Sequence, residues 1–156
     1  MPGGFIGPFV PGYTIPDGSL AAFSTNILIY NLLRGDGPLP PHSAWVDIRD
    51  VAAAIIAALR ASASEVGRKR FILAADAWYS PQEVAQYIAK ERPELAGRLS
   101  GAWKSSSPET QNILDSSRAK ETLGIRITPL KTTILSAVDS IIEIENDWGR
   151  RGVVPH

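Results

Sequence analysis

The clearest periodic pattern in the chain begins at Ile48. Apolar residues recur from there at intervals of three and four, which is the spacing of one buried face of an α-helix. They are Ile48, Val51, Ala52, Ile55, Ile56 and Leu59. Asp47 stands directly before them as an N-cap, and Asp50 adds a carboxylate near the positive end of the helix dipole. Because residues 44–47 are short and extended in character, the segment predicts a strand followed at once by a helix.

Short continuous apolar runs predict buried parallel strands, because such strands are covered on both faces. The clearest run is Arg70–Ala74, whose sequence RFILA is too short for a helix. Shorter candidates are Phe5–Ile6 and Trp45–Asp47, with Arg126–Thr128 as a possible fourth strand. So few strands, separated by helices, indicate an α/β chain with an incomplete parallel sheet.

Other helices are predicted from their ends. Ser80 with Glu83 three residues later forms a capping-box signature, and Pro81 suits the first helical position. Further helices are expected over Ser19–Leu33, Asp115–Leu123 and Pro129–Trp148, the last with Thr128 as its cap. The elements together predict an α/β fold with a partial parallel sheet and several helices. We expect a single domain over residues 1–150 and a C-terminal tail at 151–156.

Charge and residue types narrow the possible functions. Of the 156 residues, 16 are basic and 16 are acidic, so nothing in the balance suggests a nucleic-acid partner. The absence of cysteine excludes disulfides and cysteine-ligated metals, and two histidines are too few for a histidine-rich metal site. We expect no metal. No apolar run reaches the roughly 18 residues of a membrane span, and the N-terminus does not resemble a secretory signal. We therefore expect a soluble, cytoplasmic protein without a membrane partner.

The order of three motifs is more specific than any one of them. Pro2-x4-Gly7-Pro8 comes first, WVDIRDVA follows at residues 45–52, and SSRAKETLGI stands at 116–125. In this order they resemble the C-terminal, substrate-binding half of the extended short-chain dehydrogenase/reductase family. The resemblance spans roughly residues 2–145 and is closest to NAD-dependent epimerase/dehydratase-like reductases of the dihydroflavonol and cinnamoyl-CoA reductase type. It implies a truncated substrate domain of such a reductase, with a partial Rossmann-type parallel sheet and several helices.

The resemblance also defines what this sequence lacks. In that family the N-terminal half carries a glycine-rich dinucleotide loop and a catalytic Tyr-x-x-x-Lys pair. The tyrosines here are Tyr13, Tyr30, Tyr79 and Tyr87, and none has a lysine four residues later. We therefore expect no cofactor on this chain alone, and NADP or NAD only where a Rossmann half is supplied in trans. Because the missing half would leave an apolar sheet edge bare, we expect a homodimer or a complex with a separate N-terminal half.

Residues after the first expected strand are candidates for a small-molecule pocket. The resemblance implies that Pro2 passes beside a nicotinamide, if a nucleotide site is completed elsewhere. It places the substrate pocket at Gly7, Pro8, Phe9, Val10, Pro11 and Phe23, and Trp78 could close over a ligand. Such apolar and aromatic linings suit a planar or polyketide-like substrate. The alternatives are a turn that merely ends the strand, ordinary core packing, and, for Trp78, a hydrophobic staple onto the following helix.

Chemistry without a redox cofactor would need proton-handling side chains. The candidates are His42, Tyr13, Asp47 and Tyr79. Two of them have simpler interpretations, since His42 suits a solvated loop and Asp47 suits a helix cap paired with Arg49. Three functions stay open: part of a short-chain reductase of small-molecule metabolism, a stand-alone cyclase, isomerase or dehydratase, and a non-catalytic binding or assembly module.

Overall fold

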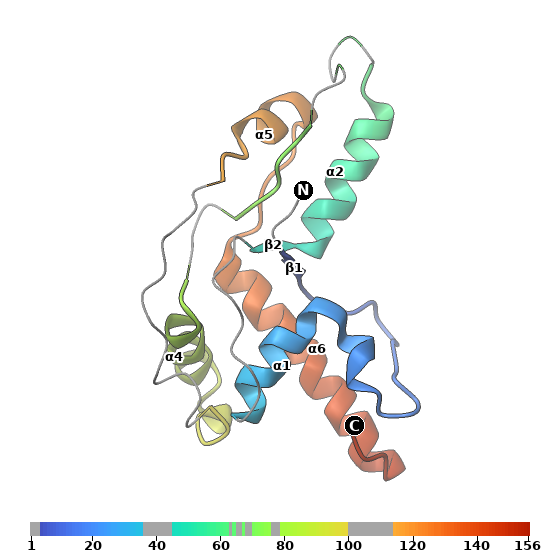
Figure 1. Ribbon diagram of the computed structural model, residues 1–156, viewed down its shortest axis with the longest axis vertical. Helices are drawn as coiled ribbons and strands as arrows, with labels where there is room; N and C mark the ends of the chain where they lie inside the picture. The colour runs from blue at the N-terminus through green and yellow to red at the C-terminus, as the bar shows by residue number, and fades with distance from the viewer. Residues whose placement is uncertain are drawn as a thin grey trace.

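The computed structural model describes residues 4–35, 45–62, 64, 67, 70–75, 79–99 and 114–156. The elements along the chain are β1 (Gly4–Ile6), η1 (Leu20–Asn26), α1 (Ile27–Arg34), β2 (Trp45–Asp47), α2 (Ile48–Arg60), α4 (Pro81–Glu91), η2 (Pro93–Leu95), α5 (Ser117–Leu123) and α6 (Leu130–Arg151). Figure 1 shows α2 and α5 in the upper part of the molecule, α1, α4 and α6 in the lower part, and the two strands between them. The expected α/β class is confirmed.

Within the described residues, the sheet consists of β1 and β2, which pair in parallel with Phe5 opposite Val46. The strand expected over Arg70–Ala74 is not a strand in the structure, although the chain runs extended there and Ala75 N donates to the carbonyl of Trp45 over 2.8 Å. Ser116 explains the difference, because its hydroxyl lies 3.0 Å from both the amide nitrogen and the carbonyl oxygen of Ala74. A side chain thus satisfies backbone groups that a neighbouring strand would otherwise bind.

The helix ends follow the sequence at two sites and depart from it at a third. Asp47 caps α2 by accepting from Arg49 N over 2.8 Å, and Ser80 and Glu83 form the expected capping box of α4. Thr128, however, does not cap α6, whose N-cap is Pro129. The amide and hydroxyl of Thr128 instead donate to the Asp50 carboxylate over 2.6 and 2.8 Å. The possible strand at residues 126–128 does not form, because the segment is irregular and Thr128 binds Asp50 instead.

The helix expected over Ser19–Leu33 is divided into η1 and α1. Ser24 lies at φ 51°, a left-handed conformation that interrupts helical hydrogen bonding. The kink leaves Asn26, rather than a capping serine, at the start of α1. Its side chain is thereby directed to the residues that follow β1, as described below.

The main core lies around α6, which contacts α1, α4 and both strands. Buried members of this core from the helices include Leu33, Ile88, Ile134 and Trp148. The residues after α6 return to the N-terminal segment, where His156 N donates to Gly18 O over 3.1 Å and His156 O accepts from Leu20 N over 2.9 Å. No helix within the described residues is both long and apolar enough to cross a membrane.

Candidate functional site

Both strands end at the same edge of the sheet, where Gly7 follows β1 and Asp47 closes β2. Asn26 holds Gly7 from both sides, accepting from its amide nitrogen at 3.1 Å and donating to its carbonyl at 2.8 Å. Gly7 has φ 150°, and a Cβ there would lie 2.8 Å from Ile48 Cγ2. Only glycine fits this position without a shift. The clamp fixes the direction in which the chain leaves the sheet, and so positions the loop of residues 8–14.

Asp47 is fully buried at this edge, and both of its carboxylate oxygens accept hydrogen bonds. Its carboxylate accepts from Arg49 Nε at 2.8 Å, from Arg49 Nη2 at 2.6 Å and from the Thr133 hydroxyl at 2.9 Å. Burial alone raises the pKa of Asp47, but the hydrogen bonds from Arg49 and Thr133 outweigh it and hold the pKa below its ordinary value. A carboxylate so saturated is a weak proton acceptor, and its position ties β2 and α2 to α6.

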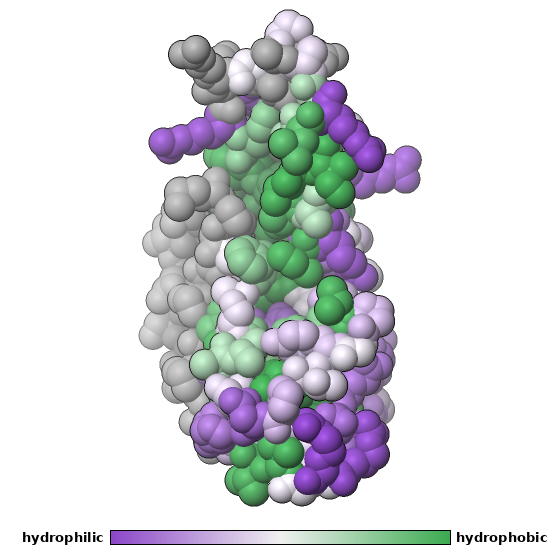
Figure 2. All heavy atoms as spheres, turned by 90° about the vertical axis from the view of Figure 1, so that its right-hand side faces the viewer, coloured by the Kyte–Doolittle hydropathy of each residue, from purple (hydrophilic) through white to green (hydrophobic). Residues whose placement is uncertain are grey.

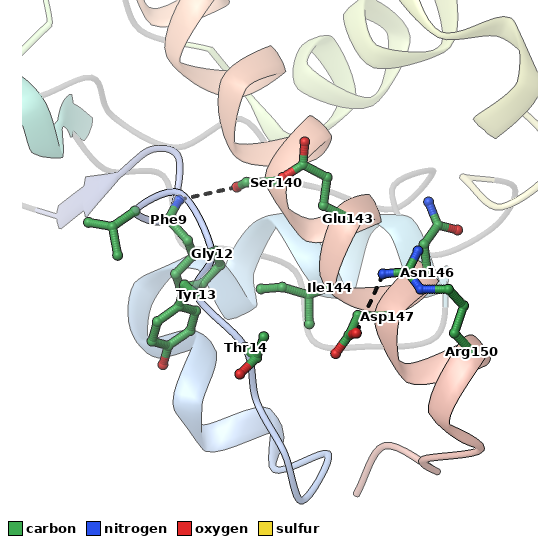
Figure 3. Close-up of a pocket in the computed structure, with 11 residues that line it drawn as sticks. Phe9, Gly12, Tyr13, Thr14, Ser140, Glu143, Ile144, Asn146, Asp147 and Arg150 are labelled. Carbon is green, nitrogen blue, oxygen red and sulfur yellow. Dashed lines mark hydrogen bonds and ion pairs between the residues drawn. The ribbon is translucent and has the colours of Figure 1, made fainter.

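The loop of residues 8–14 faces the C-terminal half of α6 across a hollow of about 310 Å³. Figure 3 shows Phe9 and Tyr13 on the loop, with Ile144 extending toward them from the helix. The rings of Phe9 and Tyr13 are stacked, with centroids 4.9 Å apart and planes only 5° from parallel. Each ring covers one face of the other, and the stacked pair forms an aromatic wall on this side of the hollow.

The opposite wall, on α6, is mostly polar. Ser140 accepts from Phe9 N over 3.3 Å, which fastens the loop to the helix. Asp147 is paired with Arg151 over 2.7 Å and more distantly with Arg150, so its charge is compensated. The full lining is Phe9, Val10, Gly12, Tyr13, Thr14, Ser140, Glu143, Ile144, Asn146, Asp147 and Arg150. An aromatic wall opposite a few polar groups is typical of a small-molecule site.

The aromatic wall is anchored in the core. The ring centroids of Phe9 and Phe23 are 5.8 Å apart. The Phe23 centroid in turn lies 4.8 Å from that of Tyr30 and 5.6 Å from that of Trp148. Trp148 Nε1 also donates to Ile15 O over 2.7 Å, closing the loop at its far end. The wall is therefore supported from behind by buried rings that leave it little freedom to collapse.

Of the pocket residues expected from the sequence, Phe9 and Val10 line the hollow, as does Tyr13 from the proton-handling set. Gly7, Pro8 and Pro11 precede or flank the lining residues without belonging to them, and Gly7 acts through the backbone clamp. Phe23 is 1% exposed and supports the wall from the core. Pro2, His42 and Trp78 lie outside the described residues.

Tyr79 lies in a different depression, between α4 and the start of α6. Lys131 Nζ stands 5.6 Å from its ring centre and 5.2 Å from that of Tyr87. Burial and the nearby Glu91 raise the pKa of Tyr87. The candidates Tyr13, Asp47 and Tyr79 thus occupy three separate places in the structure.

Sequence reasoning did not identify the α6 wall or the Asn26 clamp. The pattern of the last helix shows which residues are buried but not what their polar neighbours face. Ser140 and Asn146 carry no signal in the sequence, because their role depends on a loop about 130 residues earlier in the chain. Asn26 is similarly assigned to a helix interior by its neighbours, and only the kink at Ser24 reveals its contact with Gly7.

The described residues do not form a dinucleotide cradle. A pyrophosphate is held where a glycine-rich turn leads directly into a helix N-terminus. Here the loop after β1 leads through Gly7 into an irregular segment, and β2 enters α2 through the buried Asp47. Within the same residues, no three histidine, aspartate or glutamate side chains are grouped as metal ligands would be.

The chain is similar to parts of several known proteins. No protein-family model matches the chain. A 110-residue stretch is 34% identical to ketoreductase azaE of Aspergillus niger, covering 70% of this chain and 32% of that protein. The crystal structure of Gre2 from Candida albicans aligns with a TM-score of 0.72 at 21% identity, over 92% of this chain and 43% of its own. Yeast methylglyoxal/isovaleraldehyde reductase Gre2, solved with NADPH, aligns with a TM-score of 0.70 at 23% identity, over 91% and 42%.

The chain thus spans about a third of the ketoreductase and less than half of each solved reductase. The solved structures establish the fold, and the ketoreductase adds similarity in sequence. The chain is therefore similar in sequence to part of a ketoreductase and in fold to part of the solved reductases, which agrees with the resemblance given by the order of its motifs.

Proposed function

We propose that this chain provides the substrate-binding part of an NAD(P)H-dependent short-chain reductase that acts on small carbonyl compounds. The observation that carries the proposal is the aromatic-walled hollow between the 8–14 loop and α6. It lies beyond the carboxyl ends of parallel strands, which is where α/β folds bind ligands. A role in small-molecule metabolism of the cytoplasm accords with the absence of cysteine.

The chemistry of the hollow favours a small ligand with one flat apolar part. The stacked pair of Phe9 and Tyr13 offers an aromatic contact on one side of the hollow, and Ile144 adds an apolar side chain from α6. Thr14 places a hydroxyl at the same hollow for a polar substituent, whereas the Ser140 hydroxyl already donates to Ala137 O over 3.1 Å. The volume of about 310 Å³ is at the lower end of the range for small-molecule pockets, so an aryl ketone of one ring is an appropriate probe. The similarity to a protein described as a ketoreductase supports the carbonyl assignment.

The reducing cofactor is assigned to a separate dinucleotide-binding domain. The described residues do not fit a pyrophosphate, as the loop after β1 and the entry to α2 show. A nicotinamide cofactor would supply hydride when bound in that other domain. The residues of this chain would bind and orient the carbonyl compound and exclude water from one side of it.

A cofactor-free activity has less support. Such an enzyme needs an acid and a base that face one ligand. Tyr13, Asp47 and Tyr79 belong to three different environments, and Asp47 already accepts hydrogen bonds from Arg49 and Thr133. Nothing in the described residues favours a cyclase or isomerase over the reductase-type role.

The proposal is tested by calorimetric titration of the purified chain with acetophenone as the probe. We expect saturable binding that the variant Tyr13→Ala weakens about tenfold, since loss of one stacked ring removes roughly 1.4 kcal/mol of contact. Tyr79→Ala is the matched control, because it removes the same side chain from the other depression. Equal affinities for the two variants would contradict the assignment of the site.

A parallel titration with NADPH tests the division of labour. We expect no binding of NADPH to the isolated chain. Saturable NADPH binding by this chain alone would overturn the assignment of the cofactor to a separate domain, whatever the result with the ketone.

A further inference from the structure

The exposed surface of α2 and the depression beside α4 differ in the chemistry that they offer a ligand. Figure 2 shows hydrophobic side chains gathered over the upper part of the molecule, where α2 exposes Ile55, Ile56 and Leu59. These three side chains are hydrocarbon only, so they offer contact area without a group that selects one class of ligand. In the depression between α4 and the start of α6, by contrast, aromatic and ionisable side chains meet above an apolar base.

The depression beside α4 has a volume of about 390 Å³. Its base includes Val84 from α4 and Ile134 from α6, each only 1% exposed. The half-buried rings of Tyr79 and Tyr87 also line it. The remaining lining residues are polar and exposed, and they are Glu83, Gln86, Lys90, Glu91 and Lys131. An apolar base with a polar rim suits a small organic molecule that carries one charged group.

Lys131 supplies a cation whose position is fixed by the two tyrosines. Its Nζ lies 5.6 Å from the ring centre of Tyr79 and 5.2 Å from that of Tyr87. Both rings therefore attract the ammonium group by cation–π interaction. Among the described residues, no carboxylate forms a salt bridge with Lys131. An ammonium group carries three N–H donors, so this one has donors to offer an anion.

The acidic residues at the rim do not compensate the charge of Lys131. Glu83 belongs to the capping box of α4, where its Oε2 accepts from Ser80 N at 2.8 Å and from Ser80 Oγ at 2.9 Å. Lys90 and Glu91 contribute one charge of each sign. Burial and the nearby Glu91 raise the pKa of Tyr87, which keeps its hydroxyl protonated as a further donor.

We propose that this depression binds a small aromatic carboxylate, whose carboxylate group accepts hydrogen bonds from the Lys131 ammonium while its ring packs against the tyrosines and the apolar base. Because the tyrosine rings hold the ammonium in place beforehand, binding orders few additional side chains. A cationic ligand is disfavoured, since Lys131 already lies over both rings. The inference is independent of the proposed function, because the depression shares no lining residue with the hollow.

The experiment titrates the ¹⁵N-labelled chain with benzoate and follows the amide chemical shifts by NMR spectroscopy. We expect saturable shifts at residues 83–91 and 131–134, with a dissociation constant of about 1 mM or lower. Benzamide is the matched ligand, because it has the same shape without the charge. We expect it to bind at least about tenfold more weakly than benzoate, since hydrogen bonds to an ionised group are the stronger ones.

Lys131→Met tests the cation directly. Methionine keeps an unbranched side chain at this exposed position but removes the ammonium group, so benzoate affinity should fall about tenfold. Lys131→Arg should retain most of the affinity, because it keeps the charge. Lys120→Met is the control, since Lys120 is a lysine on α5 that does not line the depression. Circular dichroism verifies that each variant keeps its helical content.

Four results would overturn the proposal. They are equal affinities for benzoate and benzamide, a benzoate affinity that Lys131→Met leaves equal to that of Lys120→Met, shifts confined to residues 9–14 and 140–147 of the hollow, and no saturable shift up to about 10 mM benzoate. If acetophenone binds the hollow and benzoate does not bind beside α4, this inference fails while the proposed function stands. Benzoate binding without acetophenone binding would give the reverse.

Discussion

The lower, helical part of the molecule is closed, whereas the upper, sheet-bearing part is open. In the lower part α1, α4 and α6 enclose a continuous core that buries side chains such as Leu33 and Ile141 completely. In the upper part the buried cluster contains fewer side chains, and some of them, such as Val46 and Ala54, are small. There α2 exposes most of its apolar face, with Leu59 81% exposed.

The difference shows that one chain can bury one hydrophobic core completely and leave a second group of apolar side chains exposed. Leu33 and Leu59 are both leucines near the C-terminal ends of amphipathic helices, yet their exposures are 0 and 81%. Hydrophobic stabilisation follows the area removed from water rather than the residue type. The lower core should therefore dominate the stability of the isolated chain, and the upper face should contribute to association.

Leu33→Ala should have the largest effect on stability. Leu33 is fully buried in the main core, so truncation removes its contacts and leaves a cavity. We expect a loss of about 2–5 kcal/mol in the free energy of unfolding. Urea denaturation followed by circular dichroism measures it. A loss below about 1 kcal/mol would show that the lower core is not tightly packed.

Asp47→Asn should come next and should alter the pH dependence of stability. The carboxylate holds Arg49 and Thr133, and losing charged hydrogen bonds costs about 1.5–3 kcal/mol. The pKa of Asp47 is lowered in the folded state, because its hydrogen bonds outweigh burial. Its contribution is therefore complete above the unfolded value of about 3.9 and is lost as the pH falls through the lower folded value. Urea midpoints measured between pH 7 and pH 2 should fall less steeply for Asp47→Asn than for the wild type. Parallel curves would contradict the assignment.

Gly7→Ala tests the junction between the two parts. A Cβ at this position would lie 2.8 Å from Ile48 Cγ2, on a backbone at φ 150°. We expect a loss of about 1–2 kcal/mol, together with weaker acetophenone binding, because the displaced loop carries Phe9 and Tyr13. Gly12→Ala is a useful control, since a Cβ there meets nothing within 4 Å. Its own positive φ of 78° adds strain, so the clash is measured by the difference between the two variants.

Leu59→Ala should have the smallest effect on the isolated chain. With 81% of its surface exposed, the side chain loses little on truncation, and the change should stay within about 0.5 kcal/mol. The comparison with Leu33→Ala uses the same substitution under the same denaturation conditions. A loss of 2 kcal/mol or more at Leu59 would mean that the upper face is already covered in solution, for example by a second copy of the chain.

Local signals in the sequence were sufficient for several elements. Ser80 and Glu83 make the expected capping box, and Asp47 caps α2, because both interactions are completed within three residues. The strands at β1 and β2 were also predicted. Residues 70–74 do not form the expected strand, because Ser116, which is 42 residues after Ala74 in the sequence, binds the backbone of Ala74. Thr128 likewise binds Asp50 instead of capping α6, since a distant carboxylate offers it a charged acceptor.

By itself the sequence determined the class of fold, the helix faces and the family resemblance, because these depend on spacing and on the order of motifs. Only the tertiary structure decided which polar residues meet at a site. Asn26 reaches Gly7 through a kink, and Ser140 meets Phe9 across 131 positions of chain. The same holds for the two leucines, since the apolar pattern of α2 resembles that of a buried helix. A periodic pattern specifies which side chains are stabilised by burial, but the packing of the whole chain decides which of them are buried.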